Sequence, residues 1–184
     1  MNAQIKIDMF GPPHKVLRWA SARAITMLGS CPGDFAAIDR ALAAVRELLA
    51  LHDAHQRVED AIVVAAIEAR RPGASQRISD AHADHALAAR AIRTQIATVE
   101  REGAPAHALH ELYLALTHFI ADTFLHMYEE ETLVAPLLDE AYSQAELRAL
   151  HAKVGAVLTP TELAEFATAM LPALSAAERD HMRR

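Results

Sequence analysis

The chain has 184 residues, of which 52% are hydrophobic, and a formal net charge of −6. This length fits one domain with a sizeable core, and the acidic balance provides no basic stripe for a phosphate backbone, which argues against a nucleic acid partner. Only six glycines, eight prolines and 5% aromatic residues are present, a composition that favours helices over sheets. We therefore predict an all-α fold.

The N-terminal ten residues include Asp8 and lack the continuous apolar run of a signal peptide. No stretch of about eighteen uncharged apolar residues occurs anywhere in the chain, so no membrane-spanning helix is expected. These features predict a cytoplasmic protein. The single cysteine, Cys31, lies in a predicted loop without an activating neighbour and is interpreted as structural.

Four long helices are predicted in the first 142 residues. Pro12-Pro13 and Asp34 suit helix starts, whereas Gly29 and Pro72-Gly73 suit helix ends. Short connections make sequential helices antiparallel neighbours, so residues 1–142 are expected to form an up-down-up-down four-helix bundle. The predicted helices span about 13–29, 34–71, 75 or 79 to 103, and 105–142.

Residues 143–184 are predicted to form two or three short helices. Ser143 to Glu146 is a capping box, Thr159 begins another helix and Pro172 breaks it. We expect this extension to pack on the bundle within the same domain. Its apolar side chains need a surface to bury against, either the bundle or a second copy of the chain in a homodimer.

Apolar residues in the fourth helix alternate steps of three and four, the spacing of packed helices. This inward stripe is interrupted by histidine and glutamate, and the second helix repeats the same pattern seventy-one positions earlier. The predicted stripe of the fourth helix comprises Leu109, Leu112, Leu116, Phe119, Thr123, His126, Glu130, Leu133 and Leu137.

The interrupting residues belong to a duplicated pattern, in which a lone histidine is followed forty-one positions later by a His-x-x-x-Glu pair. Residues four apart share one face of a helix. Buried histidines and glutamates are costly unless something compensates them, and metal cations do so. The duplication therefore predicts a two-metal site with the ligands His14, His55, Glu59, His85, His126 and Glu130.

The sequence resembles the hemerythrin-like family of His-His-Glu cation-binding domains over about residues 10–142. The resemblance implies a four-helix bundle with a non-haem di-iron centre, in which His14, His55, His85 and His126 are ligands and Glu59 and Glu130 bridge the two irons. Its motifs are His14-Lys-Val-Leu-Arg18, His55-Gln-Arg-Val-Glu59, Asp84-His85 and His126-Met-Tyr-Glu-Glu-Glu-Thr-Leu-Val-Ala-Pro136.

Two departures from oxygen-carrying hemerythrins stand out. Ala89 occupies the place of a second third-helix histidine, and Glu130 follows His126 at four positions instead of five. Glu131 stands at five, but it is turned about 140° from His126 whereas Glu130 is turned only about 40°. His52 and His82 lie one turn from a ligand and are candidate additional ligands, second-layer donors or core histidines. The remaining histidines are interpreted as surface residues: His107, His110, His118, His151 and His181.

The expected function is a di-iron protein that binds or senses oxygen, nitric oxide or iron. No phosphate-binding loop and no nucleophile motif is present, so a binding protein is favoured over an enzyme and no catalytic residue is proposed. A di-iron oxidase or peroxidase-like enzyme is one alternative. An interaction protein with a purely structural metal is another, and the sequence does not decide between iron and another divalent metal.

Overall fold

The computed structural model describes residues 7–182, and every regular element in that range is helical. The predicted all-α class is confirmed. Two π-helical segments, η1 and η2, continue the α-helices on either side of them. In chain order the elements are α1 (Gly11–Gly29), α2 (Phe35–Val58), η1 (Glu59–Val64), α3 (Ala65–Arg70), α4 (Gln76–Arg101), α5 (Ala106–Glu129), η2 (Glu130–Val134), α6 (Ala135–Ala141), α7 (Gln144–His151), α8 (Val154–Val157), α9 (Pro160–Ala173) and α10 (Ala176–Met182).

The long helices begin and end close to the predicted signals. The side chain of Asp34 accepts a hydrogen bond from the backbone N–H of Ala37 at 2.9 Å and so caps α2. The turn between α4 and α5 contains Gly103 at φ +74°, a left-handed conformation that glycine adopts without strain. These local signals account for the short connections between the helices.

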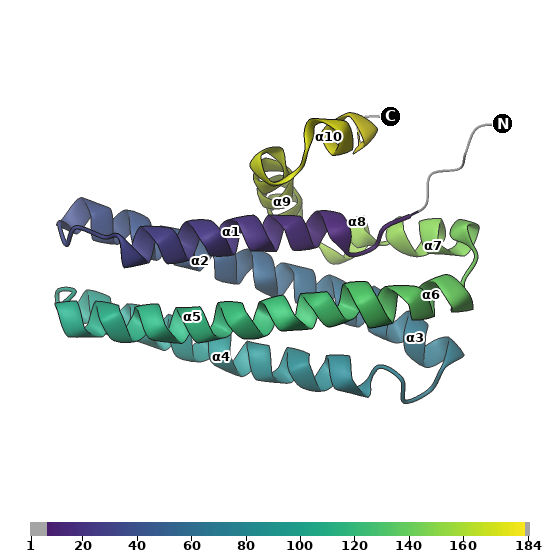
Figure 1. The fold of residues 1–184 in the computed structure, drawn as a ribbon, viewed down its shortest axis with the longest axis horizontal. Helices are drawn as coiled ribbons and strands as arrows, with labels where there is room; N and C mark the ends of the chain where they lie inside the picture. Colours follow the sequence, from purple (N-terminus) through teal and green to yellow (C-terminus); the bar gives the residue numbers. More distant parts are fainter. Residues whose placement is uncertain (1–6, 183–184) are drawn as a thin grey trace.

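The four long helices α1, α2, α4 and α5 lie side by side along the long axis of the molecule (Figure 1). α1 packs against α2 and α5, and α4 packs against α5 and α2, so the four helices enclose one interior. Heptad-spaced apolar residues fill that interior, including the fully buried Leu17, Leu48, Ile92 and Leu116. The chain is therefore a helical bundle.

Two hydrophobic clusters divide the interior of the bundle. The larger one includes residues of α1, α2, α4 and α5 and extends to Phe166 of α9. The smaller one lies at the other end and includes Phe10, Val63, Val134 and Leu147. The buried histidines and glutamates predicted as ligands lie on the helix segments between these clusters.

The π-helical segments correct part of the predicted inward stripe. A π-turn closes i→i+5 hydrogen bonds and therefore shifts the buried face by about one residue. Leu133 was expected inward but is 56% exposed, while Val134 and Leu138 are buried. The prediction for Leu133 was wrong because η2 changes the register after Glu130, and Leu137 is half-buried.

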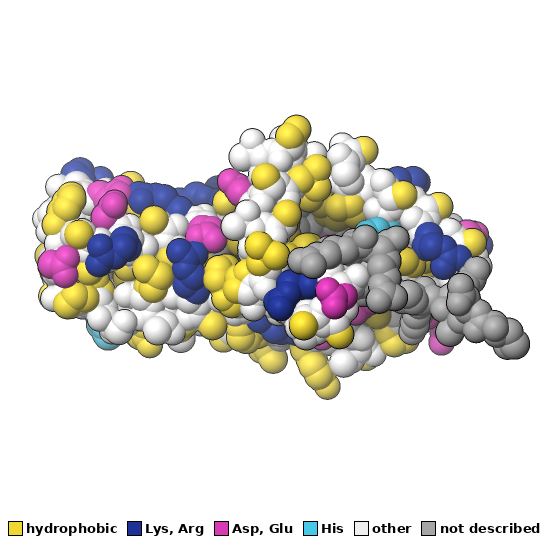
Figure 2. Space-filling model, turned by 90° about the horizontal axis from the view of Figure 1, so that it is seen from above, with side chains coloured by type: hydrophobic (Ala, Val, Ile, Leu, Met, Phe, Trp, Pro, Cys, Tyr) yellow, Lys and Arg dark blue, Asp and Glu magenta, His cyan; other side chains and the backbone are white. Residues whose placement is uncertain are grey.

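The C-terminal helices begin at the predicted capping boxes of Ser143 and Thr159. α9 crosses the bundle and packs against α1 and α2, burying Phe166 and Ala169 in the larger cluster. Pro172 lies inside α9, which ends one residue later at Ala173. Figure 2 shows hydrophobic side chains gathered on the face where the C-terminal helices cross. The domain boundary at residue 142 stays a prediction.

None of the helices within residues 7–182 is long and apolar enough to cross a membrane.

The remaining histidines were predicted to lie on the surface. The side chain of His181 lies outside the described residues. The other predicted surface histidines are exposed: His107, His110, His118 and His151.

Candidate metal centre

Each half of the duplication brings one histidine and one glutamate together on a single helical face. His55 lies in the last turn of α2, and Nε2 of its ring is 3.1 Å from Oε1 of Glu59, the first residue of η1. His126 lies in the last turn of α5, and its Nε2 is 3.3 Å from Oε1 of Glu130, the first residue of η2. The i,i+4 spacing thus produces the contacts expected from it.

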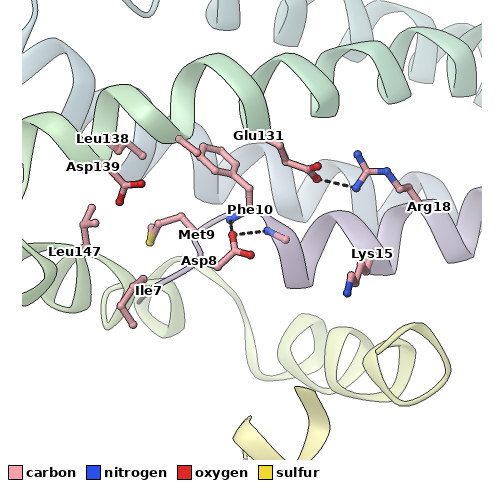
Figure 3. A pocket seen from close by; sticks show the side chains of 12 residues that line it. Ile7, Asp8, Met9, Phe10, Lys15, Arg18, Glu131, Leu138, Asp139 and Leu147 are labelled. Carbon is pink, nitrogen blue, oxygen red and sulfur yellow. Dashed lines mark hydrogen bonds and ion pairs between the residues drawn. The ribbon is translucent and has the colours of Figure 1, made fainter. Parts of the chain in front are cut away.

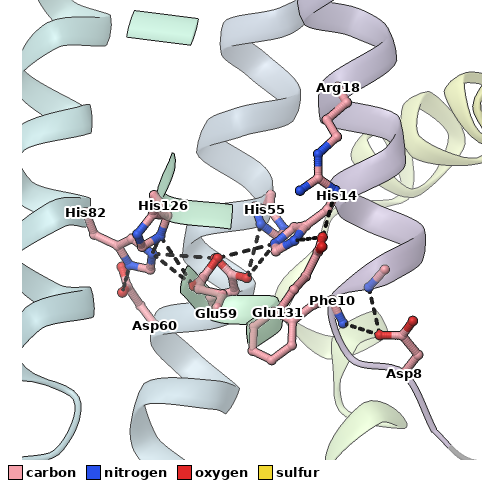
Figure 4. Close-up of polar contacts among 12 residues, drawn as sticks. Asp8, Phe10, His14, Arg18, His55, Glu59, Asp60, His82, His126 and Glu131 are labelled. Atoms are coloured by element: carbon pink, nitrogen blue, oxygen red, sulfur yellow. Dashed lines mark hydrogen bonds and ion pairs between the residues drawn. The ribbon is translucent and has the colours of Figure 1, made fainter. Parts of the chain in front are cut away.

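α1 and α4 each add one histidine that reaches both glutamates. Nε2 of His14 lies 3.5 Å from Oε1 of Glu59 and 3.3 Å from Oε2 of Glu130. Nε2 of His82 lies 3.5 Å from Oε2 of Glu59 and 3.9 Å from Oε1 of Glu130. All four long helices therefore contribute to one buried cluster (Figure 4).

The cluster consists of two groups of four ligand atoms. In the first group, His14 and His55 meet both glutamates; in the second, His82 and His126 meet the same two glutamates. The ligand atoms of each group lie within 4.8 Å of one another. We call these six residues the metal centre: His14, His55, Glu59, His82, His126 and Glu130.

His85, the third-helix ligand implied by the resemblance, belongs to neither group among the described residues. Its ring lies next to that of His126, at a centroid distance of 5.1 Å, and 5.5 Å from that of His52. His82, one turn earlier on α4, reaches the two glutamates instead. His52 is also buried, and its ring packs against that of Phe119.

The chain matches one known protein family. The model of the hemerythrin HHE cation-binding domain matches residues 6–138, most of the chain. The chain belongs to this hemerythrin family. Comparisons with curated proteins and with solved structures gave no match. The matched range ends before α7, so the C-terminal helices lie outside the hemerythrin domain as the family model describes it.

The buried polar atoms of this hemerythrin domain fit the cations that the family binds. Nε2 of His14 and His55, Oε1 of Glu59 and both carboxylate oxygens of Glu130 make no hydrogen bond. These atoms contact other members of the cluster in ion pairs at 3.1–3.5 Å but lack hydrogen bonds, and a buried polar group that lacks one costs about 1–3 kcal/mol. Imidazole nitrogens and carboxylate oxygens are suitable ligands for iron, manganese and zinc, and a cation in each group would satisfy these atoms.

The glutamates of the hemerythrin centre raise the pKa of two of its histidines, His14 and His82, and so favour their protonated forms. Burial alone lowers the pKa of His14, but Glu130 and Glu59 outweigh it and raise the pKa to about 9. Burial likewise lowers the pKa of His82, yet Glu59 and Asp60 raise it to about 9. Proton charge thus takes the place of metal charge beside the two carboxylates.

The two histidines behind the centre are held neutral. Burial, followed by the neighbouring ring of His126, lowers the pKa of His85 to about 4. Burial and the ring of His85 hold the pKa of His52 well below its usual range. Nδ1 of each ring is buried without a hydrogen-bond partner. A small cavity of about 10 Å³ lies between these rings and the metal centre.

Two further carboxylates contact the outer faces of the ligand histidines. Oε1 of Glu131 lies 2.8 Å from Nδ1 of His14 and accepts a hydrogen bond from Arg18 at 2.7 Å. Oδ1 of Asp60 lies 2.6 Å from Nδ1 of His82. Sequence reasoning considered Glu131 only as a ligand and gave Asp60 no role. Their position directly after the two glutamates is the signal that identifies them.

A cavity of about 470 Å³ lies at the start of α1 (Figure 3). Glu131 and Arg18 line it, and so does Phe10, whose ring is 5.5 Å from that of His14. Asp8 accepts hydrogen bonds there from the backbone N–H groups of Phe10 and Gly11. This cavity therefore adjoins the outer side of the first ligand group.

Proposed function

We propose that this protein is a non-haem di-iron protein whose centre, in an up-down-up-down bundle, binds or senses oxygen, nitric oxide or iron. The observation that carries the proposal is the pair of ligand groups that share both carboxylates. A shared carboxylate is suited to bridging two cations. Two histidines for each group complete a nitrogen and oxygen ligand set that suits iron.

The residues of the centre would divide into terminal and bridging ligands. His14 and His55 would hold one cation and His82 and His126 the other, while Glu59 and Glu130 would bridge them. Each cation would then receive four protein atoms, fewer than the six ligands of an octahedral site. When bound, the iron pair would supply the redox chemistry that a diatomic ligand requires.

Space for a small ligand lies directly beside the centre. The interior cavity of about 10 Å³ is close to the volume that one water molecule needs, and Glu59, His82 and His126 are among its lining residues. Larger substrates do not fit this space.

The test is anaerobic reconstitution with ferrous iron, followed by metal analysis and optical spectra with oxygen, azide and nitric oxide. We expect two irons per chain and reversible spectral changes with oxygen or nitric oxide. The variant His126→Ala/Glu130→Ala should lose the iron, while the matched variant His118→Ala, at an exposed histidine of the same helix, should retain it.

Three other results would change the function. Turnover of peroxide or ferrous iron would indicate an oxidase or peroxidase-like enzyme. A site that is fully loaded but inert to all small ligands would indicate a structural metal. If protein isolated from its source contained two zinc or manganese ions per chain, the two-metal centre would be supported. The proposed oxygen chemistry would then be ruled out.

A further inference from the structure

A surface cavity of about 270 Å³ lies between α4 and α5, next to the second ligand group. We call it the α4–α5 cavity. Its lining includes three carboxylates, Asp84, Asp122 and Glu129, and two imidazoles, His85 and His126. One of these imidazoles belongs to the metal centre and the other does not, so the cavity reaches from solvent to the centre.

The two imidazoles form the wall between this cavity and the interior. Both His85 and His126 also line the small cavity beside Glu59 and His82. Their ring centroids lie 5.1 Å apart, and the side chain of His126 remains 10% exposed. His126 therefore belongs both to the wall of the cavity and to the second ligand group, and His85 lies beside it in the same wall.

The charges around the α4–α5 cavity favour a cation. Three carboxylates line it against one guanidinium, Arg77, which is already ion-paired with Glu129. The carboxylate of Asp122 lies 3.1 Å from the exposed imidazole of His118. A recess lined by one sign of charge concentrates ions of the opposite sign and speeds their association.

His85 supplies an unsatisfied ligand atom at the inner end of this recess. The residue is 5% exposed, and its buried Nδ1 makes no hydrogen bond. A neutral imidazole nitrogen is a common ligand for divalent transition metals. The lining of the cavity thus combines exposed carboxylates with a buried imidazole, both of them types of group that bind divalent cations.

The larger cavity at the start of α1 is less suited to admit a cation. Its lining mixes both signs of charge, with Lys15 and Arg18 beside Asp8, Glu131 and Asp139, and none of the residues that line it is a histidine. Arg18 also binds Glu131, which covers the outer side of His14. The Arg18–Glu131 ion pair therefore lies between that cavity and the first ligand group.

We propose that the α4–α5 cavity is the entrance through which a divalent cation reaches the metal centre, with His85 as the first imidazole that binds it. This inference rests on the proposed function, because it requires a centre that takes up metal. In this proposal Asp84 and Asp122 determine how fast the metal enters. The six residues of the centre determine how much metal is bound at the end.

The experiment measures the rate of ferrous iron uptake by the full chain under anaerobic conditions, by stopped-flow mixing and a colour-forming ferrous chelator. The variant Asp84→Asn/Asp122→Asn should slow uptake roughly tenfold at low ionic strength, with a smaller effect in high salt. The final iron content should not change. The control Asp39→Asn/Glu111→Gln removes two exposed carboxylates elsewhere and should load at the wild-type rate.

A second variant tests His85 itself. His85→Gln should also load slowly and reach two irons per chain; a final content of one iron would make His85 a ligand and overturn the proposal. Unchanged rates in both variants, or slow uptake only in Asp139→Asn of the larger cavity, would also overturn it. A wild-type chain that takes up no iron would overturn the proposed function and this inference with it.

Discussion

Oε1 of Glu131 lies 2.8 Å from Nδ1 of His14, whose other ring nitrogen points into the metal centre. Glu131 directly follows Glu130, so one π-turn carries both a centre carboxylate and the carboxylate that orients a histidine from another helix. The same arrangement recurs where Asp60 follows Glu59 and contacts His82. Each π-turn therefore couples a glutamate of the centre to the orientation of an imidazole on another helix.

This coupling predicts that the outer carboxylates tune the two cations separately. Glu131→Gln should weaken the cation held by His14 about 10- to 100-fold, because carboxylate partners orient ligand histidines and raise their basicity. Asp60→Asn should weaken the cation held by His82 by a similar factor. Stepwise calorimetric titration with a divalent metal measures the two affinities.

Thr132→Ala is the matched control for these variants. Thr132 lies in η2 beside Glu131 but is exposed and bonds only to the backbone oxygen of Tyr128. Its replacement should leave both affinities unchanged. Equal weakening of both cations in Glu131→Gln would contradict a separate role for the two carboxylates.

A second prediction concerns the docking of α9 on the bundle. Phe166 is 7% exposed within the main hydrophobic cluster, so Phe166→Ala should lower the free energy of unfolding by about 3 kcal/mol. Leu171, on the same helix, is 57% exposed, and Leu171→Ala should change the free energy of unfolding by less than about 0.5 kcal/mol. Urea unfolding compares the two; equal losses would show that α9 does not stabilise the bundle through Phe166.

A third prediction concerns the pH dependence of α10. Hydrogen bonds from Lys15 and from Ser175 lower the pKa of Glu178 to about 2. Because this value lies below that of an unfolded glutamate, about 4.3, the contacts stabilise α10 fully above that pH and are lost as the pH falls through about 2. The amide resonance of Ser175 should therefore titrate with a midpoint near 2 in nuclear magnetic resonance spectra.

Lys15→Met provides the control for this titration. Without the ammonium group, the midpoint should move upward towards the value of an unfolded glutamate. A wild-type midpoint near 4, or no change in the variant, would show that Lys15 does not hold Glu178 in solution.

Much of the fold follows from spacing and composition. The positions of His55 and Glu59 on one face, and of His126 and Glu130 on another, needed only the period of the α-helix and the inward apolar stripe. Proline, glycine and aspartate located the helix ends within a few residues. The duplication indicated that the two halves meet, and the structure places both pairs in one cluster.

The features that escaped sequence reasoning depend on non-local geometry. Nothing in the sequence marks the π-turn at Glu130, so the buried face after it was assigned to Leu133 instead of Val134. The choice between His82 and His85 also depends on non-local packing. Both histidines lie on the inward stripe, and only packing against α2 and α5 determines which one reaches the glutamates.

Metal binding should also stabilise the fold, since the centre forms only in the folded chain. A cation at one hundred times its dissociation constant adds about 2.7 kcal/mol, which corresponds to a rise in Tm of roughly 5–10 °C for a chain of this size. Differential scanning calorimetry with and without zinc, which has no redox chemistry, measures the shift. A chelator should reverse it, and the variant His126→Ala/Glu130→Ala should show none.

The central claim is that two cations share Glu59 and Glu130, and a metal titration of single variants tests it most directly. Wild-type protein should bind two cations per chain. Glu59→Ala should weaken both of them, because this carboxylate belongs to both ligand groups, whereas His55→Ala should weaken only one. Fewer than one cation per wild-type chain, or a Glu59→Ala variant that loses one cation and binds the other with unchanged affinity, would contradict the shared centre.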